Sequence, residues 1–151
     1  MLLMDGIALS YADVPLELIK EFDLSRLIYE RGGEKELRFF RQTKHAMLPI
    51  RHDGQVEIVS WGCRTKKLPN TGYTWLKTLE AGEWVNAEEV TILATAGIRN
   101  GIWFPIRSGI RGLLAEVDGD RAVYMLVEPA TYYFKIMTRS DRMPVLIGER
   151  I

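Results

Sequence analysis

Two Asp-Gly pairs, each placed between apolar stretches, constrain the fold of this chain more than any other feature of its sequence. The pairs are Asp53-Gly54 and Asp118-Gly119. Asp-Gly is favoured in two-residue hairpin loops because both central residues of a type I′ turn take positive φ. The sequence therefore predicts two antiparallel hairpins, with strands inside residues 46–50, 56–61, 110–117 and 122–127.

The other periodic segments are short. Helices are expected at residues 13–22 and 74–81 and in a stretch that Pro129 opens and that extends to residue 137, and further strands at residues 90–95, 101–106 and 144–147. Pro15 suits the start of the first helix, Gly32-Gly33 is expected to end that helical region, and Pro105 indicates an edge strand or a bulge. Hairpins outnumber strand–helix–strand units, so the pattern predicts an α+β fold. We expect a mainly antiparallel, mixed β-sheet with an open, barrel-like core and a few short helices.

Length and composition exclude several classes of protein. The 151 residues suit a single domain, over residues 1–151, with an ordinary core. No apolar run approaches the roughly 18 residues of a membrane-spanning helix, and no basic segment opens the chain as in a secretory signal. Cys63 is the only cysteine, which excludes an internal disulfide and a multi-cysteine zinc site. A cytoplasmic protein without a metal or another cofactor is expected.

Basic residues gather in one part of the chain although the formal net charge is zero. Seven basic residues and two acidic ones lie between residues 37 and 67, together with Phe39, Phe40 and Trp61. Cations that contact phosphates and rings that stack on bases are the usual equipment of a single-strand-binding surface. The alternatives are a solvated charged face and, for at least two of the three rings, packing in the core.

Four parts of the chain carry a family resemblance. The most specific is Asp141-Arg-Met-Pro-Val-Leu146, and a looser one is Gly101-Ile-Trp-Phe104. Residues 38–50 with 59–62, and the strand at 125–130, come in the same order as the matching family motifs. Together these segments resemble the SOS-response-associated peptidase (SRAP) family. The resemblance covers residues 38 to 146 and indicates a divergent, shortened member.

The resemblance implies a compact domain that binds single-stranded DNA and crosslinks to abasic sites. In the family, a cysteine directly after the initiator Met forms a thiazolidine with the sugar aldehyde. A glutamate and a histidine assist proton transfer, and an Asn-Ala-Arg motif positions the nucleotide. Each of these expectations depends on residues that this chain would have to retain.

The chain departs from the family at the positions that perform this chemistry. Leu2 stands at the cysteine position, Pro105 near the glutamate, and Ser140 at the histidine. Neither a proline nor an unaided serine hydroxyl transfers protons at neutral pH, and the Asn-Ala-Arg motif has no clear counterpart. We therefore expect a pseudoenzyme that retains DNA binding, in which Ser140 and Cys63 are the candidate remnants of a catalytic site.

The expected partner is single-stranded or damaged DNA. Arg142 matches the family arginine that contacts the DNA backbone, and the alternatives are a structural salt bridge with Asp141 or a cap on a backbone carbonyl group. Substitution of Arg38 or Arg142 by alanine is expected to weaken binding. The candidate DNA-binding residues are Arg38, Phe39, Arg41, Lys44, Trp61, Asp141 and Arg142.

Three other hypotheses stay open at this point. Cys63 is followed by basic residues (Arg64, Lys66 and Lys67), which would favour a reactive thiolate, although a small buried residue at a strand end is the commoner case. His45 and His52 with Cys63 make a poor zinc set. The chain could also be a protein-interaction domain, such as one encoded by phage or other mobile DNA. That hypothesis predicts an exposed patch formed by Tyr132, Tyr133, Trp75 and Trp84.

Overall fold

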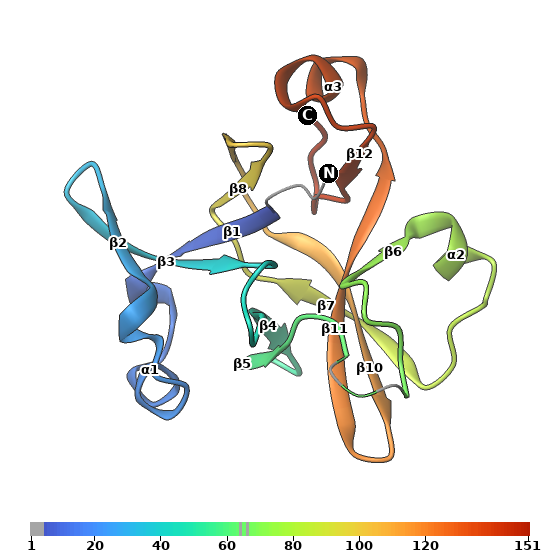
Figure 1. The fold of residues 1–151 in the computed structure, drawn as a ribbon, viewed down its shortest axis with the longest axis horizontal. Coiled ribbons are helices and arrows are strands. Elements are labelled where there is room, and N and C mark those ends of the chain that lie inside the picture. The colour runs from blue at the N-terminus through green and yellow to red at the C-terminus, as the bar shows by residue number, and fades with distance from the viewer. Residues whose placement is uncertain (1–4, 64, 66) are drawn as a thin grey trace.

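A computed structural model describes residues 5–63, 65 and 67–151. Those residues form twelve strands in two sheets, three short α-helices and two 3-10 turns (Figure 1). All strand pairs but one run antiparallel. The predicted α+β class, with a mainly antiparallel sheet and few helices, is therefore confirmed.

The first sheet has five strands, and its centre is the N-terminal strand β1. In spatial order its strands are β2 (Ile28–Arg31), β3 (Glu34–Phe40), β1 (Asp5–Ser10), β8 (Ala96–Arg99) and β9 (Ile102–Pro105). Pro105 lies on the edge strand β9, which confirms the prediction made from that proline.

The second sheet contains both Asp-Gly hairpins. In spatial order its strands are β12 (Arg142–Pro144), β11 (Asp120–Pro129), β10 (Ile110–Val117), β7 (Ala87–Ile92), β4 (Met47–His52) and β5 (Gln55–Ser60), and β6 (Tyr73–Trp75) pairs with β11 in parallel. Just after β5, Trp61 forms a bridge with Val123 of β11. The sheet thus curls so that its β5 edge returns toward β11, although the described strands form no closed barrel.

One apolar core lies between the sheets. Alternate residues such as Ile7 of β1, Phe39 of β3, Ile50 of β4 and Val123 of β11 point into it and are almost completely buried. A smaller second core lies on the other face of the β10–β11 hairpin, around Tyr124. Both faces of this hairpin are therefore covered, which explains the continuous apolar run at residues 122–127.

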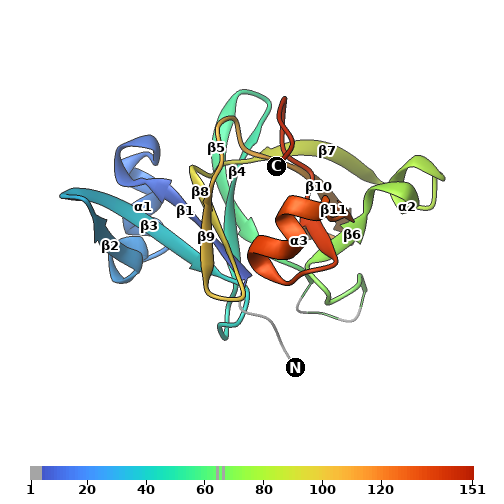
Figure 2. The ribbon, with the colours of Figure 1, turned by 90° about the horizontal axis from the view of Figure 1, so that it is seen from above.

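The helices lie at the periphery. They are α1 (Leu16–Glu21), α2 (Leu76–Glu80) and α3 (Tyr132–Thr138), and the 3-10 turns are Tyr11–Asp13 and Leu24–Leu27. In Figures 1 and 2, α1 lies near the first sheet and α2 lies at the opposite end of the molecule. Figure 1 places α3 and β12 together at the end opposite the tip of the β10–β11 hairpin.

Several predicted elements differ from the structure. Gly32-Gly33 was expected to end a helix, but it forms the turn of the β2–β3 hairpin, with φ of 58° and 85°. The helix expected at residues 13–22 is only six residues long, and the helix expected at 74–81 begins after a strand. The terminal strand comes earlier than expected, at Arg142–Pro144. Strands β1, β2, β3, β6 and β8 were not predicted. For β8 a local signal was present but not used, because Asn100-Gly101 forms its turn with β9, with φ of 50° and 80°.

Candidate nucleic-acid interface

A cavity between the two sheets is lined by two arginines, the predicted Arg142 and the unpredicted Arg99. It is small, with about 40 Å³ of space for water-sized molecules, and Tyr73, Arg99 and Arg142 contribute to its walls. None of the described residues that line it is acidic. A small cavity with two guanidinium groups at its wall suits a small anionic group, such as one phosphate.

At two positions in the wall of this cavity, only a glycine fits. A Cβ at Gly97 would lie 2.6 Å from the ring of Phe104, and a Cβ at Gly6 would lie 2.7 Å from the carbonyl oxygen of Phe39. Real Cβ atoms do not approach so closely, so a larger residue at either position would displace its neighbours. Small residues are therefore required where β1 and β8 form this wall.

Arg142 is held against an aromatic ring. Its guanidinium lies 5.2 Å from the centroid of Tyr73, within the range of a cation–π contact. Asp141 is exposed and pairs with Lys135 of α3 at 3.0 Å. The expected alternative, a salt bridge between Arg142 and Asp141, is therefore wrong, and among the described residues Arg142 has no carboxylate partner.

Ser140 is buried and serves as a support. Its hydroxyl accepts a hydrogen bond from Nε of Arg99 at 3.0 Å and donates one to the carbonyl oxygen of Arg142 at 2.7 Å. Arg99 is itself only 8% exposed. The serine thus fixes the side chain of one cavity arginine and the backbone of the other. No sequence pattern pointed to Arg99, because its partner lies 41 positions away along the chain.

A second cleft holds three other predicted residues. Arg41, Lys44 and Trp61 line an open cleft of about 850 Å³, together with Asn70. Arg41 donates to the carbonyl oxygens of Asn70 and Thr71, so its side chain is fixed along the cleft. Lys44 is exposed and has no partner among the described residues. Both cationic groups therefore lie at the surface of this open cleft.

The two hollows meet at a pair of rings. Tyr73 lines the first cavity and Trp61 lines the second cleft, and their ring centroids lie 5.7 Å apart in an edge-to-face arrangement. Nε1 of Trp61 donates to the carbonyl oxygen of Gly72 at 2.9 Å. This bond and the ring pair hold Trp61 rigidly between the two sites.

Two of the predicted base-stacking rings belong to the core. Phe39 and Trp61 are each only 2% exposed, so neither presents a free face to a ligand. The alternative of core packing is confirmed for both. Their alternating positions at the inner face of a strand explain the burial, and the basic residues beside them in sequence point elsewhere.

Arg38 lies away from both hollows, on the face of the first sheet. Its Nε pairs with Glu36 at 2.7 Å, and its guanidinium lies between the rings of Tyr29 and Trp103, at 4.4 and 5.0 Å. Burial alone would raise the pKa of Glu36, but hydrogen bonds from Arg31 and Arg38 hold that pKa below its usual value. The predicted DNA-binding residues therefore do not converge on one groove, and Arg38 serves the fold.

Cys63 lies in the second core and is 3% exposed. Its sulfur contacts the hydroxyl of Thr65 at 3.2 Å, and burial, followed by the charge of Cys63, raises the pKa of the neighbouring Tyr124 to about 12. Lys67 pairs with Asp120 at 3.3 Å and does not activate the thiol. Leu2, Arg64 and Lys66, which the sequence hypotheses also used, lie outside the described residues.

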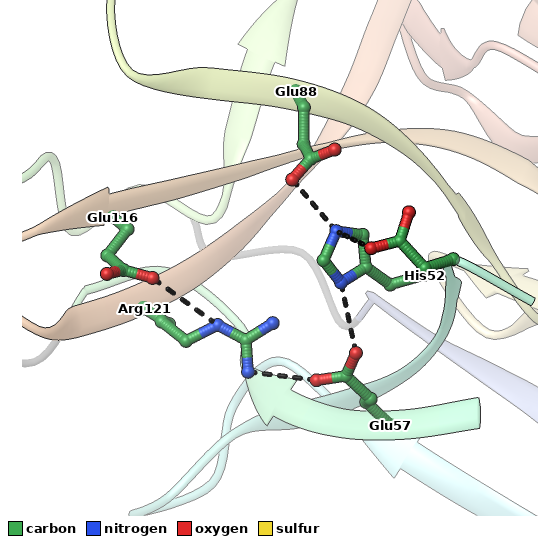
Figure 3. Close-up of polar contacts among 6 residues, drawn as sticks. His52, Glu57, Glu88, Glu116 and Arg121 are labelled. Carbon is green, nitrogen blue, oxygen red and sulfur yellow. Dashed lines mark hydrogen bonds and ion pairs between the residues drawn. The ribbon is translucent and has the colours of Figure 1, made fainter. Parts of the chain in front are cut away.

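A polar cluster that the sequence analysis missed surrounds His52 (Figure 3). Its Nδ1 lies 3.0 Å from Glu57 and its Nε2 lies 2.8 Å from Glu88, and Glu57 also accepts a bond from Arg121 of β11 at 2.9 Å. Hydrogen bonds to Glu88 and Glu57 raise the pKa of His52. Burial alone would raise the pKa of Glu57, but bonds from Arg121 and His52 lower it. The cluster joins strands at the seam of the curled sheet.

The same cluster contains the described residues best placed to hold a metal ion. Ligand atoms of His52, Asp53 and Glu88 lie within 4.8 Å of one another. Neither His45 nor Cys63 belongs to this group, so the zinc set considered from the sequence does not assemble. All three members are at least partly exposed, and Asp53 and Glu88 each pair with His52, which accounts for their proximity.

The expected patch of four aromatic residues also does not form. Trp84 packs on Tyr124 at 4.9 Å and donates to the hydroxyl of Thr74. Trp75 is partly buried, whereas Tyr132 and Tyr133 are exposed on α3. The tryptophans therefore help to cover the second core, and only the tyrosines offer a contact surface.

Comparison with known proteins identifies no relative: no protein-family model, curated protein or solved structure matches this chain. The resemblance to the SRAP family stays a prediction that depends on the motifs in the sequence. Among the described residues, no helix combines the length and apolar character needed to cross a membrane.

Proposed function

We propose that this chain is a non-catalytic, SRAP-like domain that binds single-stranded or damaged DNA across the cavity and the adjoining cleft. Arg142 and Arg99 would contact phosphate or a phosphate-bearing nucleotide in the cavity, and Arg41 and Lys44 would contact the strand in the cleft. A single strand, unlike a duplex, can bend to follow two hollows and turn unpaired bases toward apolar walls.

The observation that most strongly supports this proposal is the position of Arg142. It is held over Tyr73 at the cavity wall and has no carboxylate partner among the described residues. An arginine that serves only the fold is usually neutralised, as Arg38 is by Glu36. A guanidinium that is oriented but not neutralised is suited to bind an anion.

The side chains of this site supply no replacement for the family chemistry. The hydroxyl of Ser140 is buried and bonded on two sides, and Pro105 is exposed on the edge of the first sheet without any group that exchanges a proton. Binding, and not crosslinking, is therefore the activity that we propose.

The proposal is tested by fluorescence anisotropy with a labelled single-stranded oligonucleotide and the variant Arg142→Ala. Loss of one charged contact is expected to weaken binding about tenfold, equivalent to about 1.4 kcal/mol. The matched control is Arg26→Ala, because Arg26 is exposed and its pair with Asp23 is long, at 3.9 Å. Equal affinities of wild type and Arg142→Ala would contradict the proposed site.

A further inference from the structure

Helix α3 is mounted firmly beside the cavity. Phe134 is completely buried and packs edge-to-face on Phe104, which lines the cavity, with ring centroids 5.2 Å apart. The hydroxyl of Thr131 caps the helix by accepting a bond from the backbone N–H of Phe134 at 3.2 Å. At the other end, Asn100 donates to the carbonyl oxygen of Thr138 at 2.7 Å. The helix is therefore a fixed support next to the proposed site.

The opposite face of α3 is apolar and exposed. Tyr132, Tyr133 and Ile136 are 82%, 64% and 62% exposed. Their spacing of three and four residues places them on one side of the helix, away from Phe134 and Thr138. We call these three residues the α3 platform. Nothing in the packing of the described residues requires two exposed tyrosines there.

The charges around the platform favour a polyanion. Residues 132–139 include Lys135 and Arg139 and no acidic residue. Lys135 lies one helical turn from Tyr132, and both basic residues are exposed. Asp141, which pairs with Lys135 at 3.0 Å, is the acidic neighbour that the described contacts provide. Two rings with cations beside them match the bases and phosphates of a single strand.

We infer that the α3 platform is a stacking surface for unpaired bases of the strand that occupies the cavity. The inference rests on the proposed function, because the strand is the one that Arg142 would bind. Tyr132 and Tyr133 offer flat, rigid faces to bases of any sequence. The exposed Arg139 would contact the backbone of the strand, and Lys135 would do so by exchanging Asp141 for a phosphate. The platform thus extends the footprint of the domain beyond the cavity without adding sequence specificity.

The test compares the affinity of wild type and the double variant Tyr132→Ala/Tyr133→Ala for a labelled oligothymidine of about 20 nucleotides. Both side chains are exposed, so the fold should be unaffected, and circular dichroism checks this. Loss of two stacking contacts should weaken binding at least tenfold. The slope of affinity against salt should not change, because no charge is removed. The matched control, Tyr29→Ala, removes an exposed tyrosine of the first sheet and should bind as wild type does.

Phenylalanine variants distinguish stacking by the rings from hydrogen bonding by the tyrosine hydroxyl groups. Tyr132→Phe/Tyr133→Phe keeps both rings and should retain the wild-type affinity. If Arg142→Ala weakens binding but the alanine double variant does not, the platform is refuted while the proposed function stands. If wild type binds no oligothymidine, both fail. If the double variant only abolishes self-association in sedimentation, the platform is a contact for a second copy of the chain, and the inference is overturned.

Discussion

Among the single residues of this chain, Arg38 illustrates how a basic side chain near aromatic residues can serve stability. It pairs with the largely buried Glu36 and lies between Tyr29 and Trp103. Arg38→Ala should lower the free energy of unfolding by about 1–2 kcal/mol, because one of two cationic partners of Glu36 is lost. Urea unfolding measures this loss, with Arg26→Ala as the control. An unchanged midpoint together with weaker DNA binding would show that Arg38 belongs to the interface after all.

Cys63 gives a second prediction at the residue scale. Because its sulfur is buried against Tyr124 and Thr65, it is not accessible to an abasic-site aldehyde. Incubation with abasic single-stranded DNA should therefore give no shifted band in denaturing electrophoresis. A shifted band that disappears in Cys63→Ser would demonstrate thiol chemistry and contradict the non-catalytic proposal.

At the scale of elements, the His52 cluster joins the β4–β5 hairpin to β7 and, through Glu57, to β11. The pKa of His52 is raised in the folded state, so its protonation stabilises the fold. This stabilisation is complete below the unfolded value of 6.5 and is lost as the pH rises through the folded pKa. The lowered pKa of Glu57 acts at the acid end, where its contribution is lost as the pH falls through the folded value.

Thermal unfolding at different pH values tests whether the His52 cluster stabilises the fold. Between about pH 6 and about pH 9, the Tm of wild type should fall more than that of His52→Gln, because the variant has no proton to lose. The control is His45→Gln, which removes the other histidine and leaves the cluster intact. Parallel profiles for wild type and His52→Gln would mean that the cluster contributes nothing to the stability of the curled sheet.

For the whole molecule, local signals predicted two of the hairpins, missed those at Gly32-Gly33 and Asn100-Gly101, and did not predict the sites. Asp53-Gly54 and Asp118-Gly119 each form the expected turn because their φ preferences act within a few residues. The cavity depends on how β1 and β8 face β11 and β12, and that arrangement follows from packing across the core. The contacts between Arg99 and Ser140 and between Arg38 and Trp103 join distant segments for the same reason.

The family resemblance identified one residue of the proposed interface that composition alone would have missed. Arg142 stands outside the basic segment, and only its motif pointed to it. The basic segment itself proved to be divided, since Arg41 and Lys44 line a cleft and Arg38 supports the first sheet. The cluster of basic residues in the sequence therefore did not predict that these residues lie on different surfaces of the folded chain.

The most direct test of DNA binding is the salt dependence of wild-type affinity for single-stranded oligothymidine. Contacts from Arg41, Lys44, Arg99 and Arg142 should neutralise about four phosphates, which predicts a slope of about −3 for log affinity against log salt. Affinity should then fall roughly fiftyfold between about 50 and about 200 mM salt. A flat profile, or no binding at micromolar protein, would contradict the account.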